Sequence, residues 1–124
     1  MPDSRGSFAY QKGLQGEANA EKHLRNQGMI CIGRRYRSPY GEIDLIMLDK
    51  ETLVFVEVKA RSRSTLLEAQ MAVTPAKQKR IIQTALLYLN QHPENAQRQI
   101  RFDVVTLSDG CVQHLPNAFQ GFGW

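Results

Sequence analysis

Asp44, Glu57 and Lys59 lie inside two runs of sequence that are otherwise almost entirely apolar. If the two runs pair, the carboxylates of Asp44 and Glu57 come together, with the ammonium of Lys59 beside them. Mg²⁺ binds one or two such carboxylates and completes its octahedron with waters and phosphate oxygens. The three residues would therefore suit the hydrolysis of a phosphodiester bond. The alternative from the residues alone is structural: Glu57 and Lys59 form an ion pair on a half-exposed strand, and Asp44 marks the end of a sheet.

A β-hairpin is the element that would position these residues. The runs Ile43–Leu48 and Leu53–Val58 are rich in Ile, Leu and Val, and the turn-like residues 49–52 separate them. The apolar character of both runs predicts strands that are buried on both faces. Because side chains alternate along a strand, Glu57 and Lys59 share one face of the second strand. Both charges therefore point toward an apolar layer and need compensation there.

A family resemblance supports the nuclease interpretation. The D…ExK arrangement of Asp44, Glu57 and Lys59 resembles the PD-(D/E)xK nuclease signature, and the segments GEIDLI and FVEVKAR resemble the YraN family. This family comprises uncharacterised bacterial proteins related to the archaeal Holliday-junction resolvases. The resemblance implies that Asp44, Glu57 and the backbone carbonyl of Val58 bind Mg²⁺ or Mn²⁺. It also implies that Lys59 orients or activates the attacking water and stabilises the transition state.

A helix predicted over Lys12–Gln27 and closed by Gly28 carries a further candidate carboxylate. Its apolar stripe includes Glu17 and Glu21, and the pattern alone favours solvated carboxylates at the edge of that stripe. The GE-x-x-A segment that begins at Gly16 is similar, however, to the first helix of the YraN family. By this resemblance Glu17 is a third carboxylate at the metal, whereas Glu21 has no such support.

The charge of the chain predicts a polyanionic partner. Sixteen Lys and Arg residues stand against twelve Asp and Glu, which gives a net charge of +4. The basic side chains flank the candidate carboxylates in the sequence, so we expect sequence-independent binding of nucleic acid, and of DNA in particular, through its phosphates. The candidate binding residues are Arg34, Arg35, Arg37, Arg61, Arg63, Lys77, Lys79 and Arg80.

Length and composition predict one domain, over residues 12–119, preceded by a flexible arm at 1–11 and followed by a tail at 120–124. No signal peptide or membrane-spanning segment is evident, so we expect a cytoplasmic protein with no membrane partner. Cys31 and Cys111 are too few for a disulfide framework. Neither the cysteines nor the histidines have the spacing of a zinc site.

Four further elements complete the predicted chain. They are an edge strand at Met29–Arg35, a helix from an N-cap at Thr74 to about Asn90, and strands at Ile100–Leu107 and Cys111–Leu115. Asp103 lies within the predicted strand Ile100–Leu107, and we interpret it as a paired core acid.

The predicted order α-β-β-β-α-β-β indicates the α/β class, with a mixed central sheet and a helix on each face, as in restriction-endonuclease-like folds. The sequence thus predicts a Mg²⁺- or Mn²⁺-dependent endonuclease, with branched or junction DNA among its candidate substrates. A nucleic-acid-binding domain that kept the fold without the catalysis is the alternative. The oligomeric state stays open, with a homodimer as one alternative.

Overall fold

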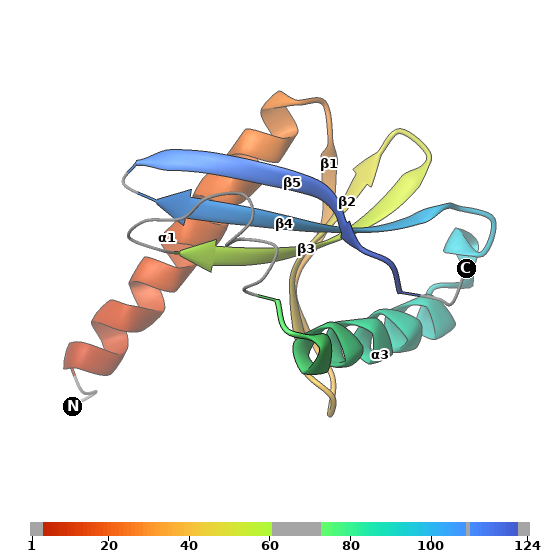
Figure 1. The fold of residues 1–124 in the computed structure, drawn as a ribbon, viewed down its shortest axis with the longest axis horizontal. Helices are drawn as coiled ribbons and strands as arrows, with labels where there is room; N and C mark the ends of the chain where they lie inside the picture. Colours follow the sequence, from red (N-terminus) through yellow and green to blue (C-terminus); the bar gives the residue numbers. More distant parts are fainter. Residues whose placement is uncertain (1–3, 61–72, 109, 122–124) are drawn as a thin grey trace.

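A five-stranded mixed sheet forms the centre of the computed structural model, which describes residues 4–60, 73–108 and 110–121 (Figure 1). The strands lie side by side in chain order, and β3 and β4 form the parallel pair among antiparallel neighbours. This confirms the predicted mixed sheet and the edge position of the first strand. The strands are β1 (Ile30–Arg37), β2 (Glu42–Asp49), β3 (Thr52–Ala60), β4 (Ile100–Ser108) and β5 (Cys111–Phe119).

Two helices cover opposite faces of this sheet (Figure 1). On one face α1 (Ser4–Asn26) packs Leu24 against apolar side chains of β2 and β3, including Val54. On the other face α3 (Pro75–Gln91) packs Tyr88 against Phe55, with their ring centroids 5.8 Å apart. A short 3₁₀ turn, η1 (Pro93–Asn95), follows α3. The layered arrangement predicted from the sequence is therefore present.

The boundaries of the helices follow local capping chemistry. The Thr74 hydroxyl accepts a hydrogen bond from the backbone N–H of Lys77 at 3.2 Å, which confirms the predicted start of α3. Gly28 adopts a φ of 98° after α1, as expected of a residue in the left-handed region that closes a helix. The start of α1 was not predicted correctly, because the helix begins at Ser4 rather than near Lys12. The polar sequence between them has no apolar periodicity, but it also has no proline to prevent a helix.

Within the described residues, neither helix combines the length and the apolarity that crossing a bilayer requires.

Strand β5 is longer than predicted, because it continues through Pro116 to Phe119. A proline is tolerated here because β5 is an edge strand and its register with β4 shifts between Phe102 and Val104. Asn117 adopts a φ of 53° at this irregularity, and its N–H donates to the Asp103 carboxylate at 2.9 Å. A side chain thus satisfies a backbone group that the shifted strand pairing leaves free.

The carboxylate of Asp103 ties several elements together from a buried position in β4. Arg101 donates to both of its oxygens, at 2.9 and 3.0 Å, and His114 of β5 lies 2.7 Å away. Arg101 also donates to Asp49 at the end of β2. Burial alone would raise the pKa of Asp103, but the hydrogen bonds from His114, Arg101 and the Asn117 backbone outweigh it and lower the pKa. Asp103 is therefore the paired core acid that the sequence predicted.

We expect Asp103→Asn to lower the free energy of unfolding by about 3–5 kcal/mol at pH 7, because it leaves the buried side of Arg101 without its charge partner. The folded-state pKa of Asp103 is lowered below the ordinary value of 3.8. The difference between wild type and variant should therefore be full above that value and disappear as the pH falls below it. Urea unfolding at a series of pH values measures this.

Asp49→Asn is the matched control, since Asp49 contacts the same Arg101 from a more exposed position. It should cost less than about 1 kcal/mol. Equal losses for the two variants would contradict a special structural role for Asp103.

Candidate functional site: a carboxylate group at the split of the hairpin

The candidate site lies where β2 and β3 separate. Their backbone pairing runs from Asp49↔Thr52 to Leu45↔Val56 and ends before Asp44. There the backbone N–H of Val58 donates to Oδ2 of the Asp44 side chain at 2.7 Å. The Asp44 carboxylate thus lies in the opening between the two strands and is held there by β3.

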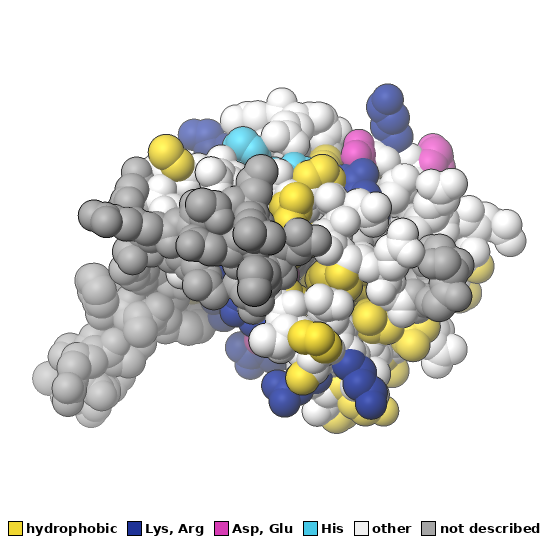
Figure 2. Space-filling view, in the orientation of Figure 1, with side chains coloured by type: hydrophobic (Ala, Val, Ile, Leu, Met, Phe, Trp, Pro, Cys, Tyr) yellow, Lys and Arg dark blue, Asp and Glu magenta, His cyan; other side chains and the backbone are white. Residues whose placement is uncertain are grey.

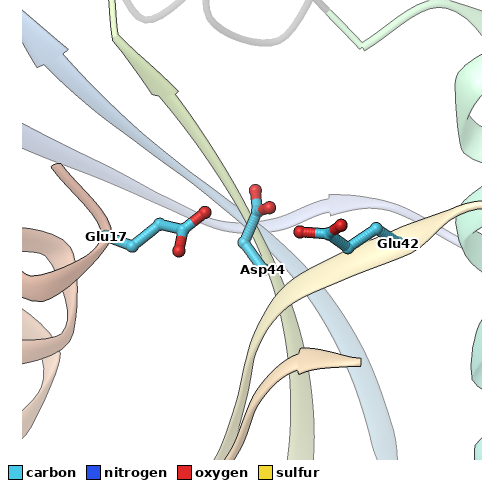
Figure 3. A group of neighbouring side chains, drawn as sticks. All are labelled: Glu17, Glu42 and Asp44. Carbon is cyan, nitrogen blue, oxygen red and sulfur yellow. The ribbon is translucent and has the colours of Figure 1, made fainter. Parts of the chain in front are cut away.

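Three carboxylates meet at this opening (Figure 3). Glu17 reaches it from α1, and Glu42 and Asp44 reach it from β2, with one oxygen of each residue within 4.8 Å of the others. Figure 3 shows the Glu17 and Glu42 carboxylates approaching Asp44 from opposite sides. All three side chains are half-buried. The structure therefore brings together Asp44 and Glu17, as predicted, and adds Glu42.

Electrostatic repulsion is strong at Asp44. Burial and then the nearby charge of Glu57 raise the pKa of Asp44 to about 8, and the charges of Glu17 and Glu42 add to the effect. The hydrogen bond from Val58 works in the opposite direction without cancelling it. A divalent cation would favour the ionised form that this environment otherwise disfavours.

Glu57 lies close enough to Asp44 for its charge to act there, but it is not one of the three carboxylates that meet at the opening. Its side chain is 8% exposed and faces α3, where the ammonium of Lys77 lies 2.7 Å from Oε1. The ammonium of Lys59 lies 3.6 Å from the same oxygen. The shared face of Glu57 and Lys59 was predicted, whereas the ion pair with Lys77 was not. Lys77 is therefore the ion-pair partner of Glu57, and its predicted contact with nucleic acid stays a prediction.

The two lysines have opposite pKa shifts. Burial and the adjacent Lys77 ammonium lower the pKa of Lys59. Burial also disfavours the charge of Lys77, but the hydrogen bonds to Glu57 and Lys59 and the charges of Glu57 and Asp44 together outweigh it, and the pKa of Lys77 is raised. Lys77 is thus the firm counter-ion of Glu57, and Lys59 is the more easily deprotonated of the two.

The arginines of β1 form ion pairs with acidic side chains. Arg35 donates to Glu17 at 2.7 Å, and Arg37 donates to Glu42 at 3.0 Å. Arg34 forms two bonds to Glu21, the second acid of the α1 stripe, at 2.6 and 2.8 Å. Because of these pairs, the predicted phosphate-binding role of the β1 arginines competes with existing ion pairs.

The remaining predicted binding residues divide into two groups. Lys79 and Arg80 of α3 are exposed, and they form no ion pair within the described part of the chain. Arg61 and Arg63 lie outside the described residues. Among the described residues of the predicted set, Lys79 and Arg80 are therefore the two exposed cations without an ion pair, and their contact with phosphate stays a prediction.

Sequence reasoning missed Glu42, although a signal for it was present. Glu42 and Asp44 lie two positions apart in one strand. Because side chains alternate between the two faces of a strand, residues at this spacing point to the same face. The contribution of Glu42 depends on the opening of the hairpin, which the apolar pattern does not encode. Val58 enters the observed contacts through its N–H. Metal binding by its carbonyl stays a prediction.

Comparison with known proteins places this chain in a family. The sequence model of the uncharacterised protein family UPF0102 matches residues 16–107. The chain belongs to this family. A UPF0102 protein of Rhodopseudomonas palustris (strain BisB18) is 45% identical over 113 residues, which cover 90% of this chain and 82% of the relative. A UPF0102 protein of Francisella tularensis subsp. tularensis (strain WY96-3418) is 37% identical over 108 residues, which cover 86% and 92%.

The family match confirms the YraN resemblance, since UPF0102 is that family. Its matched segment contains Glu17, Glu42, Asp44 and Glu57, so the whole candidate site lies within the UPF0102 region. The family is described as uncharacterised, and the chemistry therefore has to be argued from the site.

Two substitutions should change stability in opposite directions. Asp44 has an ordinary pKa of 3.8 that the fold raises to about 8. Between these values the folded state keeps a proton that the unfolded state has lost, so wild-type stability falls as the pH rises through this window. Without divalent metal, Asp44→Asn should be more stable than wild type by on the order of a few kcal/mol above pH 8, and the difference should vanish near pH 4.

Glu57→Gln is the comparison, and it should instead lower the free energy of unfolding by about 1–3 kcal/mol, because Lys77 loses the carboxylate that it contacts. Thermal melts in EDTA at several pH values measure both effects. A lower melting temperature for Asp44→Asn at high pH would show that burial and the neighbouring carboxylates do not destabilise the ionised form of Asp44.

Proposed function

We propose that this UPF0102 protein is a divalent-metal-dependent endonuclease that hydrolyses phosphodiester bonds in DNA. The observation that carries the proposal is the convergence of Glu17, Glu42 and Asp44, with ligand oxygens within 4.8 Å of one another, beside the Glu57–Lys59 pair. The D…ExK resemblance supports the same chemistry, and the sheet with a helix on each face is compatible with a restriction-endonuclease-like fold.

The donor set fits Mg²⁺ or Mn²⁺. Carboxylate oxygens are the ligands that these hard cations prefer, and Mg²⁺ uses a small number of them together with water and substrate phosphate. Asp44 is the central candidate ligand, because β3 fixes its orientation and its ionised form is otherwise destabilised. Glu17 and Glu42 would share the cation while their arginines hold them in place. Glu57, as the acid of the D…ExK arrangement, is the candidate ligand on β3.

Each group of the site has a definable part in the hydrolysis. A bound metal would lower the pKa of water and neutralise charge that develops on the phosphate. Water attacks phosphorus and loses a proton to the solvent, the bond to the leaving oxygen breaks, and that oxygen takes up a proton. Lys59 lies beside the carboxylates, where its ammonium can donate to the attacking water or to a phosphate oxygen. Lys77 holds Glu57 and so positions the acid next to Lys59.

A nucleic-acid-binding domain without catalysis is the second candidate function. The observation that favours it is the strong Lys77–Glu57 ion pair, which occupies the acid that a D…ExK nuclease would direct at the metal. Both functions use the net charge of +4, and cleavage distinguishes them.

Metal binding should be visible without a substrate. A cation that binds the folded state stabilises it by RT ln(1 + [L]/Kd), which is about 2.7 kcal/mol when the concentration is 100 times Kd. We expect Mn²⁺ or Mg²⁺ to raise the melting temperature of the wild type and to have little effect on Asp44→Asn. Asp49→Asn, at the far end of β2, is the control and should respond as the wild type does. A wild type that ignores both metals contradicts the metal site.

Lys59→Met should reduce DNA cleavage by at least about 100-fold and leave DNA affinity nearly unchanged, because its charge acts at the reacting phosphate. Folding should survive, since Lys77 still neutralises Glu57. Lys50→Met, in the exposed turn of the same hairpin, is the control and should cleave normally. The measurement is single-turnover cleavage of single-stranded, duplex, flap and junction DNA with Mn²⁺. Cleavage by Lys59→Met at the wild-type rate would rule out this mechanism.

A further inference from the structure

We propose that Tyr40, Lys79 and Arg80 form a binding surface for unpaired nucleotides, with Tyr40 stacking on a base and the two cations contacting the phosphates beside it. This surface, called the Tyr40 surface below, deepens the proposed function by naming its substrate class, and it rests on the nucleic-acid binding in that proposal. It needs neither the metal nor the catalytic step.

Tyr40 is held in a fixed place while its side chain stays accessible. It belongs to the turn between β1 and β2, and the residue is 50% exposed. The Ser38 hydroxyl accepts hydrogen bonds from the backbone N–H groups of Tyr40 and Gly41, at 3.0 and 3.2 Å. The same hydroxyl lies 2.7 Å from the Thr84 hydroxyl of α3. The backbone that carries Tyr40 is therefore anchored, which reduces the entropy lost when its ring binds a ligand.

The turn rests on α3 at Arg80. A methyl group placed on Gly41 would lie 3.5 Å from the Arg80 Cβ, so the backbone next to Tyr40 passes directly over that residue. Thr84, which anchors the turn, also donates to the Arg80 carbonyl at 2.9 Å. The exposed residues Tyr40 and Arg80 therefore have backbones that lie next to each other. Figure 2 shows Lys and Arg side chains next to hydrophobic ones at the lower end of this face, where the β1–β2 turn and the start of α3 lie in Figure 1.

The absence of an ion pair within the described part of the chain distinguishes these two cations from the arginines of β1 and from Lys77. Arg35, Arg37 and Lys77 are each within 3.0 Å of a carboxylate. Lys79 and Arg80, in contrast, have no acidic partner among the described residues and are exposed. Arg80, which adjoins the turn that carries Tyr40, is therefore an exposed cation without an acidic partner in the described ranges, as is its neighbour in the sequence, Lys79.

This combination of groups favours unpaired nucleotides over a duplex. In a duplex both faces of each base are covered by neighbouring bases, so a protein ring cannot stack without disrupting it. An unpaired base offers its face freely, and stacking on an aromatic side chain is worth roughly 1–3 kcal/mol per base, whatever the base. Glu42, a member of the carboxylate group, follows the turn directly in the sequence. A strand held on the Tyr40 surface would therefore run close to the proposed reaction site.

Binding of a fluorescent oligothymidylate and of a duplex of equal length, in EDTA so that cleavage is absent, tests the surface. We expect the wild type to bind the single strand more tightly. Tyr40→Ala should weaken single-strand binding by about 5- to 150-fold, with Tyr40→Phe close to wild type and duplex binding little changed. Lys79→Ala with Arg80→Ala should weaken binding of both DNAs and make the affinity less dependent on salt.

Leu86→Ala is the matched control, because Leu86 is an equally exposed apolar residue of α3 and should leave both affinities unchanged. Equal single-strand affinity for Tyr40→Ala and wild type, with melting temperatures preserved, overturns the proposal, as does a wild type that prefers duplex. The cleavage assay with Mn²⁺ separates the two ideas. Tyr40-dependent binding without cleavage overturns the nuclease and keeps the surface, whereas cleavage that ignores Tyr40 keeps the nuclease and overturns the surface.

Discussion

The hydrogen bond from the Val58 N–H to the Asp44 carboxylate is the contact on which the candidate site depends. At this point β2 stops pairing with β3, and a side chain replaces the backbone acceptor that the sheet would otherwise supply. The bond satisfies a backbone donor and fixes a carboxylate in a partly buried opening. Glu17 and Glu42 can approach Asp44 only because the strands separate there.

Charge compensation around this opening is uneven. Glu17 and Glu42 each have an arginine from β1, and Glu57 has Lys77 from α3. Asp44 has no cation within ion-pair distance among the described residues, and burial together with the charge of Glu57 raises its pKa. The fold thus disfavours the ionised form of one carboxylate in particular. Ionised Asp44 destabilises the protein unless a cation compensates it, which is a physical reason to associate the position with function.

The basic residues serve two different purposes. Those of β1, together with Lys77, neutralise acids within the protein, so they make a small contribution to the external field. Lys79 and Arg80 remain exposed beside Tyr40. Net charge alone cannot make this distinction, because a cation counts equally whether or not a carboxylate lies next to it.

The sequence by itself determined the hairpin, the cap at Thr74, the mixed sheet and the shared face of Glu57 and Lys59, because periodicity and capping are local properties. It did not determine which charges meet. Lys77 contacts Glu57 only once α3 lies across the sheet, and Glu42 reaches Asp44 only where β2 and β3 part. The strand through Pro116 likewise depends on the Asp103 carboxylate. Those outcomes depend on distances between segments far apart in the chain, which only the packed structure fixes.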